Sequence, residues 1–215
     1  MAHIYTEGVD YMGRRKYTLN IKPFKIDSHA KYYWLGVLAT DGNIAKKEAR
    51  IRLELKNDDI DLLKNLANFC ETNMPLHTRI NNSKCECSCL DINSSELKKY
   101  LAEYNIVPDK TKTFIMPLEK IPNEYLWDFI RGMMDGDGCI TYIKSHVYNP
   151  YGISFVSANL ECVKQMKKIW ELPEEHKIST NNDAYILQKS GKGCLSILEK
   201  MYMDSTEQTR LNRKY

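Results

Sequence analysis

The sequence predicts an α+β protein in which one folding unit occurs twice, each copy with the order helix, strand, strand, helix, strand, strand, helix. Two apolar helical stretches, at 34–42 and 130–138, each contain an internal glycine and end in Asp-Gly. After each stretch, the same order of strand and helix patterns recurs at a nearly constant spacing of about 100 residues. Few residues are identical between the copies, so the duplication is inferred from order and pattern.

The composition is that of a globular protein. The chain has 215 residues, 43% of them hydrophobic, and a formal net charge of +3, which permits a nucleic-acid partner without requiring one. No apolar run approaches the roughly 18 residues that a membrane span needs, and the N-terminus lacks a signal-peptide hydrophobic region. Seven cysteines without framework spacing indicate reduced thiols. We therefore expect an intracellular protein, in the cytoplasm or an organelle matrix.

The first half is expected at 25–105, after an N-terminal arm at 1–24. The arm contains Gly13-Arg14-Arg15-Lys16, which suits either a solvated segment or one that contacts phosphates. N-cap chemistry at Asp27-Ser28-His29 begins a helix that Gly42 ends. Residues 49–56 alternate strictly and predict a strand, with apolar residues on one face and Arg50, Arg52, Glu54 and Lys56 on the other. Three cations on one open face suit the reading of phosphates or base edges.

The rest of the first half predicts a helix at 57–69, a hairpin of strands at 77–80 and 85–92, and a helix from Ser94 to about Tyr104. Cys85, Cys87 and Cys89 alternate, so they would share one face of a strand. With His77 nearby a zinc site is conceivable, but zinc-binding pairs usually sit on turns with wider spacing. Small buried hydrophobic residues are the favoured interpretation of these cysteines.

The second half is expected at 126–215, after a linker at 106–125 that holds three of the seven prolines. It opens with the second apolar helix. Strands are predicted at 139–144 and 152–156, an amphipathic helix at 159–170, further strands at 177–180 and 185–189, and a closing helix at 194–202.

The two helix ends carry the predicted chemistry. Asp41 and Asp137 would each face the negative end of a helix dipole, which disfavours a carboxylate by up to about 1 kcal/mol. A divalent cation removes the conflict, because carboxylate and terminal carbonyl oxygens form a hard site suited to Mg²⁺. Gly36 and Gly132 would let the two helices approach closely, bringing the acids together. An EF-hand loop starting at Asp135 is excluded, because Cys139, Ile140 and His146 stand at positions that such a loop reserves for other residues.

These two stretches resemble the paired signature of the LAGLIDADG homing endonucleases in their two-motif, monomeric form. Further residues agree: Asp109-Lys110-Thr111 before the linker, Phe129-Ile130-Arg131-Gly132 in the second motif, and the closing Leu211-Asn212-Arg213-Lys214-Tyr215. The resemblance covers residues 25 to 215. One position departs from it, because the earlier acid of the motif is Asp135 in the second half but Ala39 in the first; that position is not a metal ligand in the family.

The resemblance implies two αββαββα units related by a pseudo-twofold axis, with the motif helices at the interface and the antiparallel strands forming a DNA-binding saddle. It implies a site-specific double-strand DNA endonuclease, associated with intron or intein mobility, that cuts an asymmetric target of roughly 20 base pairs and leaves short 3′ overhangs. The residues expected to contact DNA are Arg50, Arg52, Glu54, Lys56, Arg79, Tyr142, Lys144, Ser154, Gln188, Lys189 and Arg213.

For catalysis the resemblance implies that Asp41, Asp137 and the carbonyls of Thr40 and Gly136 bind Mg²⁺. Mn²⁺ is expected to substitute, and Ca²⁺ to bind without supporting cleavage. Lys189 is the candidate for organising solvent at the site, with no evident counterpart in the first half, so the two strand cuts are expected to be unequal. The alternative is a non-cleaving DNA- or RNA-binding protein of the same fold, such as an intron maturase or a transcription regulator, but such proteins usually lose the paired acids.

Overall fold

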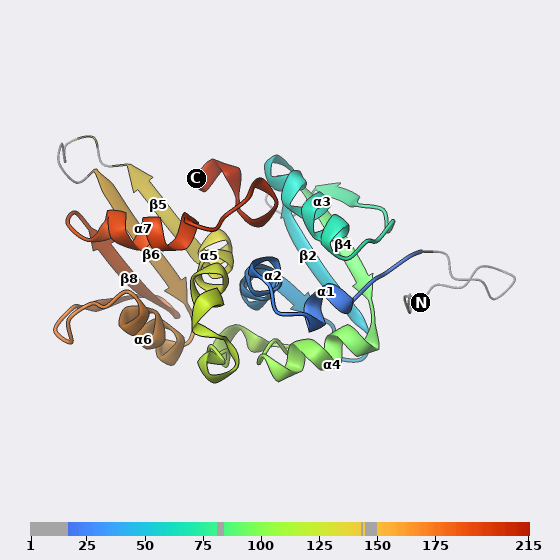
Figure 1. Ribbon diagram of the computed structural model, residues 1–215, viewed down its shortest axis with the longest axis horizontal. Coiled ribbons are helices and arrows are strands. Elements are labelled where there is room, and N and C mark those ends of the chain that lie inside the picture. The colour runs from blue at the N-terminus through green and yellow to red at the C-terminus, as the bar shows by residue number, and fades with distance from the viewer. Residues whose placement is uncertain (1–16, 81–83, 143, 145–149) are drawn as a thin grey trace, which may run out of the picture.

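The computed structural model describes residues 17–80, 84–142, 144 and 150–215, and it confirms the duplicated unit (Figure 1). The first half contains α2 (His29–Thr40), β1 (Gly42–Ile44), β2 (Arg50–Lys56), α3 (Ile60–Phe69), β3 (His77–Ile80), β4 (Glu86–Asn93) and α4 (Ser95–Glu103). The second contains α5 (Leu126–Asp137), β5 (Gly138–Tyr142), β6 (Tyr151–Ser157), α6 (Leu160–Ile169), β7 (Ile178–Asn181), β8 (Ala184–Ser190) and α7 (Cys194–Tyr202).

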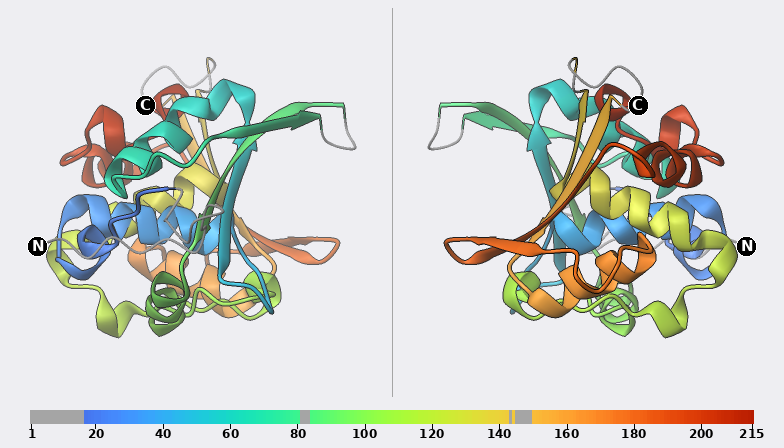
Figure 2. Two further views of the ribbon diagram at one scale, coloured as in Figure 1. Left: turned by 90° about the vertical axis from the view of Figure 1, so that its right-hand side faces the viewer. Right: turned by 90° about the vertical axis from the view of Figure 1, so that its left-hand side faces the viewer.

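Each half has one four-stranded antiparallel sheet, and the two sheets have the same strand order, β1-β2-β4-β3 and β5-β6-β8-β7. Helices α2 and α5 lie side by side in the middle of the molecule, with one sheet on each side (Figure 1). The β3–β4 and β7–β8 hairpins project to the same side of the molecule (Figure 2). The predicted α+β class and element order are therefore confirmed.

Helix α2 begins where the sequence predicts, because the Ser28 side chain accepts a hydrogen bond from the backbone N–H of Lys31. The helix is buried on nearly every side, including Tyr33, Trp34 and Leu38. It packs against α5 through Gly36 and Gly132, at which an added Cβ would lie 2.2 Å and 2.1 Å from a backbone oxygen of the facing helix. The expected close approach at these two glycines is confirmed.

The alternation in β2 places Ile51 and Leu53 in the core, opposite Ile92 and Leu90 of β4. The other face carries Arg52 opposite Asp91, and Lys56 opposite Cys87. Cys87 and Cys89 share that second face, as predicted, and both are buried. Across the described ranges, no group of three or more His, Cys, Asp or Glu side chains is arranged to hold a metal ion.

The segment predicted as a linker is part of the core. It forms short 3₁₀ turns at Lys110–Lys112, Leu118–Lys120 and Asn123–Tyr125, and the side chains of Phe114, Met116 and Ile121 between them are buried. The prolines limit regular structure here, but the apolar residues among them still anchor the chain.

The predicted N-terminal arm is also partly packed. Its residues 1–16, with Gly13-Arg14-Arg15-Lys16, lie outside the described residues, but Leu19, Ile21 and Phe24 are buried. Phe24 belongs to the short helix α1 (Lys22–Lys25) and meets Phe69 of α3 edge to face, with ring centroids 5.0 Å apart. None of the helices in the described ranges combines the length and apolarity needed to cross a bilayer.

The segment after α7 returns to the first half. Asn65 of α3 donates a side-chain hydrogen bond to the Glu207 carbonyl at 3.2 Å, and Thr209 and Leu211 are buried. This C-terminal segment (203–215) therefore lies across both halves, near the ends of α2 and α5 (Figure 1).

Candidate active site

The two acids predicted to bind metal lie where the central helices end. Asp41 caps the C-terminus of α2, with its backbone N–H bonded to the Val37 carbonyl at 2.9 Å, and Asp137 is the last residue of α5. The helix ends meet, because a Cβ added to Gly136 would lie 2.1 Å from Thr40 Oγ1 and 3.0 Å from Asp41 Oδ2. Glycine at 136 is thus required by the approach of α2.

The electrostatics of this pair disfavour two negative charges. Burial raises the pKa of Asp137 to about 6, and the neighbouring Asp41 carboxylate raises it further. Burial also raises the pKa of Asp41, against the lowering effect of Lys214 and Lys110. The Asp137 side chain is nonetheless reachable by solvent, so surrounding protein atoms desolvate its carboxylate only in part.

Two lysines complete the helix ends, and the sequence reasoning missed both. Lys110 donates to the carbonyls of Thr40, at 3.4 Å, and Gly42. Lys214 donates to the carbonyls of Met134, Asp135 and Gly138, each at 2.7 Å. Each ammonium therefore offsets the negative end of one helix dipole.

Burial lowers the pKa of both lysines, while the Asp41 carboxylate opposes this for each. A signal for them exists in the sequence, because each lysine follows the closing helix of one half, within Asp109-Lys110-Thr111 and within Arg213-Lys214-Tyr215. The two motifs share only the lysine, so this signal is weak.

Lys189, predicted to serve the site, lies elsewhere. It stands opposite Ile153 on the helix-covered face of the second sheet, and its Cε atom lies 3.6 Å from a Cβ built on Gly193. The lysines that act on the two acids are Lys110 and Lys214. The expected asymmetry, with a lysine in the second half alone, is therefore replaced by one lysine for each helix end.

Asp135 is buried, and its hydrogen bonds indicate a structural role and not one in binding a cation. Its Oδ2 atom accepts hydrogen bonds from the Tyr33 hydroxyl and the Leu211 backbone N–H, each at 2.8 Å. Its Oδ1 atom has no hydrogen-bond partner among the described residues. Because Leu211 precedes Lys214 by three residues, its hydrogen bond to Asp135 holds in place the segment that contains this lysine. Ala39, its counterpart in α2, provides no such anchor.

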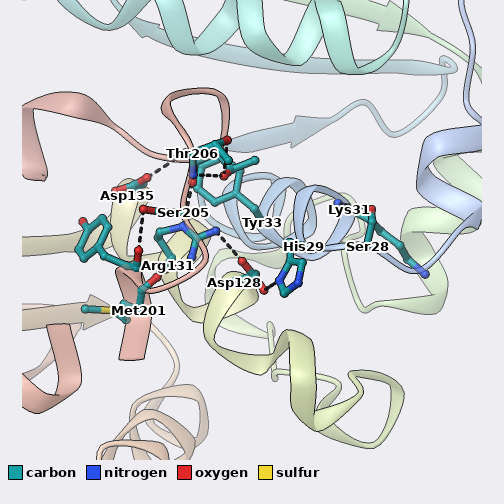
Figure 3. Close-up of polar contacts among 12 residues, drawn as sticks. Ser28, His29, Lys31, Tyr33, Asp128, Arg131, Asp135, Met201, Ser205 and Thr206 are labelled. Carbon is teal, nitrogen blue, oxygen red and sulfur yellow. Dashed lines mark hydrogen bonds and ion pairs between the residues drawn. The ribbon is translucent and has the colours of Figure 1, made fainter. Parts of the chain in front are cut away.

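A buried polar network secures the same C-terminal segment to α5 and α2 (Figure 3). Arg131 is 1% exposed and bonds to the Asp128 carboxylate at 2.6 Å and to the Thr209 carbonyl at 2.8 Å. Asp128 in turn bonds to His29 Nδ1 at 2.7 Å. The Arg131 guanidinium also lies 5.3 Å from the centre of the Tyr33 ring.

The donors at the helix ends suit a hard cation. Mg²⁺ is usually held by one or two carboxylates together with waters and substrate phosphates, without a complete cage of protein side chains. Asp41 and Asp137 provide two carboxylates, and the carbonyls of Thr40 and Gly136 adjoin them in the chain. Burial raises the pKa of both carboxyl groups, so a positive charge placed beside them would favour their ionised forms.

The open face of the first sheet carries charges that are already paired. Arg52 makes two hydrogen bonds of 2.7 Å to Asp91, and Arg79 makes contacts of 2.6 to 3.1 Å to Glu54. Arg50 lies 3.7 Å from Glu48, and Lys56 is exposed. The predicted residues therefore share one surface, and carboxylates orient two of the arginines.

The open face of the second sheet is polar and largely uncharged. Ser154 and Gln188 are paired in register and line a groove of about 350 Å³ with Thr141, His176 and Ser190, and Lys189 also borders this groove. Tyr142 does not join them, because it stands opposite Tyr151 on the helix side of the sheet. Lys144 is exposed beyond the end of β5, and Arg213 is held by Asp59 at 2.9 to 3.2 Å.

No family model and no curated protein matches this chain by sequence, but solved structures of LAGLIDADG proteins match its fold. The homing endonuclease I-WcaI bound to its DNA recognition sequence is 13% identical, with a TM-score of 0.59 over 86% of this chain and 85% of that one. The LAGLIDADG meganuclease I-AabMI bound to uncleaved DNA is 12% identical, with a TM-score of 0.51 over 80% and 83%.

The N-terminal LAGLIDADG domain of WhiA is 16% identical to this chain, with a TM-score of 0.53 over 88% of this chain and 89% of that domain. The chain thus has the two-motif LAGLIDADG fold, as the signature stretches predicted. At these identities the likeness establishes the fold, and the function has to be argued from the site.

Proposed function

We propose that this chain of LAGLIDADG fold is a site-specific double-strand DNA endonuclease that hydrolyses one phosphodiester in each strand. The observation that supports it best is the meeting of Asp41 and Asp137 at the ends of α2 and α5, with a lysine bonded to the carbonyls at each end. A purely structural helix pair gains nothing from placing two partly desolvated carboxylates beside each other.

In this proposal the two open sheet faces bind the major groove of an asymmetric target, and the helix ends lie at the scissile phosphates. Asp41 and Asp137, with the Thr40 and Gly136 carbonyls, hold Mg²⁺ or Mn²⁺. The bound cation supplies charge neutralisation at the phosphate and lowers the pKa of water. Lys110 and Lys214 keep the helix-end carbonyls in place and add positive charge beside the phosphates.

The deciding experiment is selection of cleaved molecules from a random duplex library with Mg²⁺, repeated with a chelator and with Ca²⁺. A single recovered sequence family, cut in both strands only with Mg²⁺ or Mn²⁺, is expected. Asp41→Asn and Asp137→Asn should abolish cleavage and still bind the selected duplex, and Asp61→Asn, at an exposed position of α3, serves as the matched control. Full cleavage by either active-site variant would overturn the metal assignment.

The alternative is a DNA- or RNA-binding protein that does not cleave. This alternative is kept because the fold is also similar to the N-terminal LAGLIDADG domain of WhiA. Retention of both helix-end acids argues against it. Binding of a defined duplex or structured RNA without cleavage under any divalent cation would select it.

A further inference from the structure

Two pockets flank the acid pair, and they occupy corresponding places in the repeat. The first-half pocket, about 450 Å³, lies between Asp41, the end of β2 and the C-terminal segment. The second-half pocket, about 130 Å³, lies between Asp137, the end of β6 and Lys110. In the proposed function, on which this inference rests, each pocket adjoins one scissile phosphate.

The charges that line the two pockets differ. The first-half pocket has five carboxylates, those of Asp41, Glu54, Asp58, Asp59 and Asp135, and two cations, Lys56 and Arg213. Among the described residues lining the second-half pocket, Asp137 is the one acid, beside Lys110 and the hydroxyls of Thr111 and Ser157. A phosphate that approaches Asp41 therefore meets more negative charge than one that approaches Asp137.

The residues that precede α3 and α6 show how the difference is built. Asn159, the N-cap of α6, accepts a hydrogen bond from the Glu161 backbone N–H at 2.9 Å. Asp59, in the same place before α3, makes no such cap bond. It forms an ion pair with Arg213, whose side chain is 57% exposed. One of the two cations that line the first-half pocket is thus already paired with a carboxylate, because Asp59 does not cap α3.

We propose that the two active sites are unequal and that the protein cuts its DNA strands in a fixed order, first at the Asp137 site and then at the Asp41 site. The phosphate at Asp41 must compete with Asp59 for Arg213 and also meets Asp58, whereas the phosphate at Asp137 meets Lys110 and hydroxyl donors. Asp58 and Asp59 are the residues that set this order, through charge and without contact to the reacting atoms.

The test measures charge repulsion without metal or cleavage. A duplex selected from a random library by binding in a chelator is prepared with an uncharged methylphosphonate at one of the two phosphates nearest the acid pair or at the other, and its affinity is measured in a chelator. Removing the charge should strengthen binding at least about threefold more at one position than at the other. In Asp59→Asn, the larger of the two affinity gains should fall to within about twofold of the smaller one. In Asn159→Asp, the affinity gain should increase at the position that showed the smaller gain in the unmodified protein.

The cleavage arm uses the same duplex with each strand labelled. The strand whose phosphate responds to Asp59→Asn should be cut second, so that a nicked intermediate accumulates, and this variant should reduce its accumulation. Equal gains at both positions in the unmodified protein, or one position responding to both variants, would overturn the inference. If the protein binds the duplex without cutting it, the nuclease proposal alone is overturned, because the affinity measurements still test the asymmetry. If the protein binds no duplex, both proposals are overturned.

Discussion

A methyl group added to Gly132 would lie 3.0 Å from the Cα atom of Gly36, and the same distance separates Gly132 Cα from a methyl group added to Gly36. The two backbones therefore touch at this point, without an intervening side chain. Because Asp41 and Asp137 lie five residues further along their helices, the distance between the helices here also sets how closely the acids approach.

Gly36→Ala and Gly132→Ala should each destabilise the protein by about 1–3 kcal/mol, because the added carbon meets facing backbone that cannot rotate away. An ordinary helical Gly→Ala change would instead stabilise by about 1 kcal/mol. Chemical denaturation of each variant measures the sign directly. A gain in stability would show that the helices have room to separate, and the glycines would then need another explanation.

The pKa of Asp137, about 6, predicts an unusual pH dependence of metal binding. A divalent cation binds the deprotonated carboxylate, so protons compete for the site as the pH falls through about 6, instead of near the ordinary aspartate value. Titration of the DNA-free protein with Mn²⁺ between pH 5 and 8 should show affinity falling below pH 6. The fall should be reduced in Asp137→Asn.

The same shift affects stability with a definite sign. A carboxyl group whose pKa is raised on folding binds protons more tightly in the folded state, so its contribution to stability increases as the pH falls from above 6 toward 4. In metal-free protein, Asp137→Asn should therefore raise the melting temperature at pH 8 more than at pH 5. An equal effect at both pH values would mean that the carboxylate is not strained by its neighbours.

Lys110→Met and Lys214→Met should lower the cleavage rate at saturating DNA while duplex affinity stays within a few-fold. Methionine keeps an unbranched side chain but removes the ammonium from the helix-end carbonyls, and hydrogen bonds to charged groups stabilise by about 1.5–3 kcal/mol. Lys168→Met, at an exposed position of α6, is the matched control and should cut at the normal rate. A slow Lys189→Met variant beside a normal Lys214→Met variant would restore the original expectation for Lys189.

Local patterns predicted the helices and strands well, and the recurrence of each pattern in the second half was the main evidence for the duplicated fold. Ser28 at an N-cap, alternation in 49–56 and Asp-Gly at both helix ends are local signals, and each has its expected structure. Lys110 and Lys214 were missed because their partners are backbone carbonyls about 70 to 80 residues away in sequence, and such contacts leave no periodic trace.

The sequence also failed to predict on which face of a strand some side chains lie. Gln188 lies on the open face of the second sheet, and Lys189, the next residue, consequently lies on the other. Tyr142 was misplaced for the same reason, because a difference of one residue in register reverses the face of every side chain. The charge pairs on the first sheet were likewise not predictable, because they depend on which residues of β4 and β3 stand opposite β2.

The Arg52–Asp91 pair gives the sharpest prediction for recognition. Both side chains are largely covered, with 27% and 20% exposed, and two parallel hydrogen bonds fix the plane of the guanidinium. Arg52→Ala should weaken target binding by about 1–3 kcal/mol if this group reads a base edge, since it also leaves Asp91 unpaired toward the DNA.

Asp91→Asn should act in the opposite sense, because it frees the guanidinium to contact phosphates of any sequence. Affinity for a scrambled duplex should rise and its salt dependence should steepen, while discrimination between target and single-base variants falls. Arg79→Ala, which removes the partner of Glu54 on the more exposed edge, should show a smaller effect of the same kind as Arg52→Ala. Unchanged affinity and base preference in Arg52→Ala would remove the open face of β2 from the DNA interface.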